Sequence, residues 1–238
     1  MTVPDPHPPR RAQEPSHRSL LIANLGFMVV AVVGALAGGV IQDLRWHGSL
    51  AKPEGQLDLA ERAFQSGNEQ VALMLFTKLA GQNNPVAEYW LAHMTELGLG
   101  LARDPAKAIG LYQKAAAQNV VPAQQRLGEI YLDGNLVPPD FMQAKNYLEQ
   151  AAYRGNARAA MLLGQMYRVG LGIEADLKEA YAWSEVATLE GNAFAKRERD
   201  MSLRGLSADD QKAAVARAKE ILEKIKREET GAKSPTSK

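Results

Sequence analysis

The chain contains no cysteine. This excludes disulfide bonds, thiolate metal ligands and a cysteine nucleophile, although it does not fix the cellular compartment. The chain also has almost no net charge, because 28 basic and 27 acidic side chains leave a formal charge of +1 at pH 7. Nucleic-acid binding needs a concentrated basic surface, so we expect no nucleic-acid partner.

Motifs typical of enzymes are missing as well. Neither phosphate-binding pattern, G-x-x-x-x-G-K-[ST] or G-x-G-x-x-G, occurs in the sequence. His93 is the only histidine in the segment that we expect to fold, so it has no histidine or cysteine partner for a metal ion. His93 and Glu96 share a helical spacing, but no nucleophile accompanies them. We therefore expect no catalytic residue, no cofactor and no metal ion.

One long apolar run stands near the N-terminus. Residues 1–18 are rich in proline and charge and predict a disordered tail. The stretch from Leu20 to Ile41 has no charged residue and would rise roughly 33 Å as a helix, enough to cross a bilayer. We assign residues 19–41 to a transmembrane helix. Arginines before it predict a bacterial inner-membrane protein with a cytoplasmic N-terminus and periplasmic repeats.

The same segment has a second interpretation. Ala35 and Ala37 form an A-x-A pattern, so cleavage after Ala37 would leave a soluble periplasmic protein. The apolar run continues past Ala37, which favours the uncleaved anchor. Gly34 and Gly38 also form a GxxxG motif that would allow homodimers in the membrane. Residues 42–55 then read as a linker.

From Ala87 onward the sequence repeats itself every 36 residues. The interval separates Ala87, Ala123 and Ala159, and it also separates Gly98, Gly134 and Gly170, and Asp104, Asp140 and Asp176. A fixed period of this size predicts a stacked array of helix pairs. The glycines would close the first helix of each pair. The aspartates would cap the N-terminus of the second helix.

Two stretches carry a family resemblance: RLGEIYLDGNLVPPDFMQAKNYLEQAAYRGNA and LLGQMYRVGLGIEADLKEAYAWSEVATLEGNA resemble Sel1-like repeats. The resemblance covers residues 86–193. Residues 56–85 resemble a tetratricopeptide helix pair, residues 194–229 read as capping helices, and residues 230–238 read as a flexible tail.

The expected fold is all-α: an α-solenoid of stacked antiparallel helix pairs after a single transmembrane helix. The resemblance implies a non-enzymatic scaffold that binds a protein or peptide partner in envelope signalling or assembly. Some Sel1-like proteins have been linked to β-lactam binding or hydrolysis, so an envelope enzyme of that type is the alternative.

A partner should dock on the concave side, which the first helix of each unit lines in such solenoids. Spacing opposite the small buried residue selects three positions in each of three helices. They mix aromatic, charged and amide groups, as protein interfaces do. We call this set the strip: Tyr89, His93, Glu96, Gln125, Glu129, Leu132, Met161, Gln165 and Arg168. Three other aromatic residues, Tyr112, Tyr147 and Trp183, fit packing between repeats instead.

Overall fold

The structure, a computed structural model, describes residues 53–231. The predicted tail 1–18, the transmembrane segment 19–41 with Gly34 and Gly38, and most of the predicted linker lie outside the described residues. By its internal contacts the chain divides into two units, 1–56 and 57–238, and all of the helical array after residue 56 belongs to the second. None of the helices between residues 53 and 231 combines the length and hydropathy that a membrane crossing requires.

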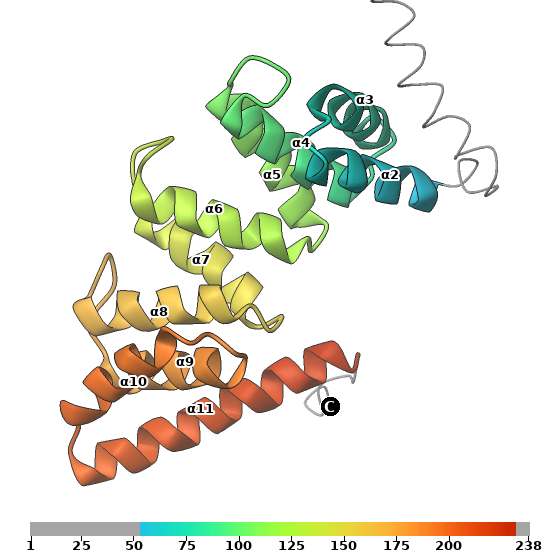
Figure 1. Cartoon of the computed structure of the whole chain (residues 1–238). Helices are drawn as coiled ribbons and strands as arrows, with labels where there is room; N and C mark the ends of the chain where they lie inside the picture. The colour runs from blue at the N-terminus through green and yellow to red at the C-terminus, as the bar shows by residue number, and fades with distance from the viewer. Residues whose placement is uncertain (1–52, 232–238) are drawn as a thin grey trace, which may run out of the picture. The chain divides into compact units, whose positions relative to one another are not determined.

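All regular structure in this described range is α-helical, and successive helices fold back on one another as hairpins (Figure 1). The close pairs are α4 with α5, α6 with α7, and α8 with α9. In chain order the helices are α2 (Pro53–Gln65), α3 (Glu69–Ala80), α4 (Pro85–Leu97), α5 (Pro105–Ala117), α6 (Val121–Asp133), α7 (Phe141–Ala152), α8 (Ala157–Val169), α9 (Leu177–Leu189), α10 (Ala195–Arg204) and α11 (Ala208–Glu229).

The predicted helix caps are confirmed. The side chains of Asp104, Asp140 and Asp176 accept backbone N–H bonds at the starts of α5, α7 and α9. This satisfies donors that a helix N-terminus otherwise leaves unpaired. Gly98, Gly134 and Gly170 end α4, α6 and α8 with φ of 76°, 71° and 71°. A left-handed residue in this position favours glycine, which has no Cβ.

The array buries two groups of apolar side chains. The first joins α2, α3 and α4, with Phe76, Leu79 and Met94 fully buried. The second runs through the three repeats into α11, and Tyr112 and Trp183 are buried in it as expected for packing residues. Tyr147, the third aromatic residue assigned to packing, lies partly buried against the same core.

Small residues set how closely the helices of a pair approach. At Gly164 an added Cβ would meet Ser184 Oγ and would lie 3.1 Å from the carbonyl oxygen of Ala180 on α9. At Gly128 it would lie 2.6 Å from Cγ of Leu148 on α7. Helix pairs this close hold their side chains in few orientations, and the first helices therefore present fixed surfaces.

Two boundaries differ from the prediction. Helix α2 begins at Pro53, inside the predicted linker 42–55, because proline at a first helical position already has a helical φ and needs no N–H partner. Helix α10 begins at Ala195, one residue after the predicted start of the capping helices at residue 194, and the side-chain oxygen of Asn192 accepts the N–H of Phe194 in the preceding turn. Ser207 caps α11 and accepts from the N–H of Asp210.

Candidate functional site

The strip lies on α4, α6 and α8, and none of its nine side chains is fully exposed. Glu96, Glu129 and Met161 are buried, which corrects the expectation that all nine positions face a partner. The remaining six are half-buried: Tyr89, His93, Gln125, Leu132, Gln165 and Arg168. Their outer edges are therefore the part of the strip that a partner can touch.

Glu96 is buried because two neighbours bind its carboxylate. The hydroxyl of Tyr112 on α5 donates to Oε2 at 2.9 Å. Arg126 on α6 donates to both oxygens, with Nε 3.0 Å from Oε2 and Nη2 on Oε1. A two-pronged arginine–carboxylate pair is strong and fixes geometry as well as charge. Burial opposes the charge of Glu96, but the hydrogen bonds from Arg126 and Tyr112 outweigh burial and lower its pKa.

Glu129 extends this pairing to the next repeat. Its Oε2 lies 3.2 Å from Nη1 of Arg126, and its Oε1 lies 2.5 Å from Nε of Arg158 on α8. The side-chain amide of Gln125 donates to the same oxygen. Four charged residues thus alternate in sign across α4, α6 and α8. We call them the charge ladder: Glu96, Arg126, Glu129 and Arg158.

An aromatic group adjoins the ladder on α4. The rings of Tyr89 and His93 stack with centroids 6.4 Å apart, and Phe64 and Trp90 lie 5.0 Å apart beside them. His93 Nδ1 lies 3.5 Å from the hydroxyl of Tyr112. Burial lowers the pKa of His93, although the Glu96 carboxylate opposes that shift. His93 is therefore part of a packed group, rather than a free acid or base.

Sequence reasoning missed Arg126 and Arg158, and a signal for them was present. The pairs Glu96–Arg126 and Arg168–Glu198 are each separated by 30 residues. Glu129 and Arg158 are separated by 29. Opposite charges that recur at this spacing, about two helical turns less than one repeat, indicate ion pairs between neighbouring first helices.

Helix α10 continues the strip by one more unit. The pair Arg168–Glu198, with Nε and Oε2 2.7 Å apart, joins α8 to α10. The 36-residue period relates three residues of α8 to three residues of α10. It relates Met161 to Arg197, Gln165 to Met201 and Arg168 to Arg204. All three residues of α10 are exposed, and they were not among the predicted site residues. Extending the 36-residue spacing of the strip by one more repeat would have selected them.

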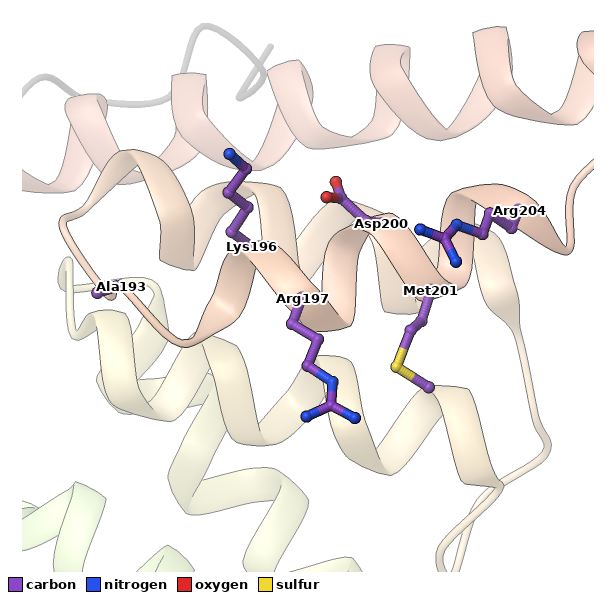
Figure 2. A pocket seen from close by; sticks show the side chains of 6 residues that line it. All are labelled: Ala193, Lys196, Arg197, Asp200, Met201 and Arg204. Atoms are coloured by element: carbon purple, nitrogen blue, oxygen red, sulfur yellow. The ribbon is translucent and has the colours of Figure 1, made fainter.

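These three side chains line a pocket of about 590 Å³ on the outer face of α10. The same face carries Ala193, Lys196 and Asp200. Figure 2 shows Arg197 and Met201 on one edge of this face and Lys196 and Asp200 on the other. A second pocket, of about 320 Å³ and lined by Lys145 and Tyr167 among others, differs because its lysine already pairs with Glu149.

Between residues 53 and 231, no three histidine, aspartate or glutamate side chains are placed together to hold a metal ion. The groups that do converge are ion pairs and aromatic rings. Such groups bind and orient other molecules, and here they mainly hold one another.

Comparison with known proteins identifies the repeats. Three consecutive segments, 85–120, 121–156 and 157–192, match the family described as Sel1 repeat. The chain therefore contains three Sel1 repeats, as the resemblance implied, with bounds one residue from the predicted 86–193. A search of curated protein sequences finds no match to this chain.

Two solved structures are similar to this chain. A Sel1 repeat protein from Oxalobacter formigenes is 28% identical with a TM-score of 0.59, over 71% of this chain and 69% of that one. A putative Sel1 repeat protein from Klebsiella pneumoniae subsp. pneumoniae is 27% identical with a TM-score of 0.45, over 65% and 79%. Together with the repeat match, the first of these defines the array as an all-α Sel1-type scaffold, a fold that serves protein–protein interaction.

Proposed function

We propose that this protein is a non-enzymatic scaffold that binds a protein or peptide partner along the strip. The observation that supports this most is the row of half-buried side chains on α4, α6 and α8, three helices that the charge ladder joins. A surface whose side chains are already ordered loses less entropy when it binds. Tyr89, Gln125 and Gln165 offer the mixture of ring and amide groups that peptide interfaces use.

Photo-crosslinking in cells tests the strip. A photoreactive amino acid at Gln165 should give discrete adducts with a partner. The matched control is the same amino acid at Lys107, an exposed position on the second helix α5. Equal adducts from both positions, or none from the strip, would remove the strip as the docking surface.

We also propose that residues 20–41 tether the scaffold in a bacterial inner membrane, with the repeats in the periplasm. The support is the uncharged run Leu20–Ile41 with arginines before it. A tether would raise the effective concentration of the array for partners in the envelope. Fractionation with intact-mass measurement tests this: we expect the full chain in the membrane fraction. A soluble product that begins at Gly38 would show cleavage after Ala37 instead.

The GxxxG of Gly34 and Gly38 adds a third element, self-association in the membrane. Changing both glycines to isoleucine should abolish crosslinked dimers and leave partner adducts from Gln165 in place. Dimers that survive this change would move self-association from the membrane segment to another part of the chain.

A further inference from the structure

Helix α10 carries positive charge that nothing in the described residues neutralises. Its two acidic residues are occupied: Glu198 binds Arg168, and Asp200 binds Arg199 with Oδ1 2.8 Å from Nη2. Lys196, Arg197 and Arg204 are exposed and form no ion pair within residues 53–231. Three free cations thus gather around one pocket that contains a single, already paired carboxylate.

Exposed apolar groups accompany these cations. Phe194 is 81% exposed at the start of α10, and Met201 is 41% exposed within the pocket lining. By helical spacing the two lie on the same side of the helix as Arg197. Large apolar side chains that remain exposed beside unpaired charges are typical of binding surfaces rather than of ordinary solvated helix faces.

We propose that this face of α10 binds an acidic peptide segment of the partner protein. The proposal rests on the proposed scaffold function and deepens it, because α10 continues the strip into a fourth unit. Carboxylates of the peptide pair with Arg197 and Arg204, and an apolar side chain between them packs on Met201. Arginine suits this role because its planar guanidinium binds a carboxylate through two parallel hydrogen bonds.

The geometry fits an extended peptide. Arg197 and Arg204 are seven residues apart on the helix, a rise of about 10.5 Å. In an extended chain, side chains two or four residues apart share one face, and four residues span about 13 Å. Two carboxylates four residues apart, with an apolar residue midway, therefore face the helix together, and the long arginine side chains cover the remaining difference of about 3 Å. The peptide backbone also supplies N–H donors for the free oxygen of Asp200, which the fatty-acid chains and phosphates of an anionic lipid surface do not.

Fluorescence anisotropy with a defined probe tests this proposal. The probe is a short labelled peptide with two glutamates four residues apart and a leucine midway between them, and its control has glutamine in place of both glutamates. The full-length protein, in a neutral detergent, should bind the acidic probe at least about ten-fold more tightly than the control. Binding should weaken as added salt shortens the screening length from about 10 Å to about 3 Å.

Matched charge reversals locate the binding surface. Arg197→Glu with Arg204→Glu should weaken binding of the acidic probe at least about ten-fold, because attraction becomes repulsion. Lys107→Glu with Lys114→Glu changes the net charge equally on exposed positions of α5 and should change binding less than about two-fold. The milder Arg197→Gln with Arg204→Gln should fall between them. Circular dichroism checks that the variants are folded, and all three should retain the helical spectrum.

Three outcomes would overturn the inference. Equal weakening by the two reversals would reduce it to a net-charge effect. Binding of vesicles with anionic lipid, without binding of the peptide, would make α10 a membrane-contacting face. Self-association that the α10 reversal abolishes would make the occupant a second copy. If Gln165 still forms partner adducts in any of these cases, the scaffold function stands and only the assignment to α10 falls.

Discussion

The first helices of the repeats and helix α10 occupy equivalent positions in the 36-residue period, but they place charge differently. On α4, α6 and α8 the charges face one another across neighbouring helices, as in Glu96 with Arg126. On α10, Glu198 pairs with Arg168 in the same way, but Arg197 and Arg204 face solvent. One repeating framework therefore carries two kinds of surface, one that holds the stack together and one that remains available.

The difference indicates what each surface can contribute. A partly buried ion pair adds little net stability compared with apolar packing, but removing one partner is costly because the other is left unpaired. Exposed charges contribute little to stability and remain free to attract a ligand. Changes in the charge ladder should thus affect folding, and changes on α10 should affect binding.

The largest effect on the free energy of unfolding is expected at Gly164, where α8 and α9 approach each other closely. Gly164→Val should destabilise the protein by about 3 kcal/mol, because the added atoms would meet Ser184 and the backbone of Ala180. Gly110→Ala is the control, since an added Cβ there meets nothing within 4 Å. It should stabilise by about 0.5 kcal/mol through better helix propensity. Chemical denaturation measures both, and similar effects at the two sites would contradict the close approach of α8 and α9.

The next effect tests the ladder itself. Glu96→Gln should lower the free energy of unfolding by about 2 kcal/mol, because Arg126 loses its two-pronged acceptor and Tyr112 its charged one. Glu174→Gln is the matched control, since Glu174 is exposed and forms no ion pair in the described residues. Its effect should stay below about 0.5 kcal/mol. Equal melting temperatures for the two variants would show that the ladder adds nothing.

Acidification should weaken the ladder end of the array in two steps. The pKa of His93 is lowered by burial, so the folded state resists protonation and stability falls as pH drops below the unfolded value of about 6.5. The pKa of Glu96 is also lowered, so its contribution is complete above about pH 4.3 and is lost as pH falls through the folded value. Unfolding measured against pH should lose the first step in His93→Gln and the second in Glu96→Gln. Identical profiles in all three proteins would contradict this.

The smallest effect is expected on α10. Arg197→Gln with Arg204→Gln should change stability by less than about 0.5 kcal/mol, because neither side chain has a partner to lose within the described residues. The same denaturation experiment serves as the measurement. A loss as large as that of Glu96→Gln would show that these arginines support the fold, and the contrast between the two surfaces would disappear.

Much of the fold could be predicted from the sequence because its determinants are local. Asp104 and Gly98 act on the helix ends beside them, and Gly164 acts on the one helix that it faces. The residues responsible for such effects recur at a fixed spacing in the sequence. They therefore predicted the helix pairs and their caps.

The candidate site was predicted less completely because it depends on contacts between units. A helical face can be read by spacing, but Glu96 is buried through an arginine 30 residues away, on the next first helix. The strip was also ended one unit early, since Leu206 and Lys212 stand 36 residues after Gly170 and Asp176, where the other units have the loop glycine and the capping aspartate. Arg197 and Arg204 could have been found from the period, although not their lack of partners.

Arginine side-chain NMR of the full-length protein tests the contrast between the two surfaces most directly. Titration with the acidic peptide should shift the Nε–H signals of Arg197 and Arg204 and leave that of Arg126 unchanged, since Arg126 already donates to Glu96. A shift of Arg126 with no change at Arg197 and Arg204 would contradict the account, because the paired surface would then be the one that binds.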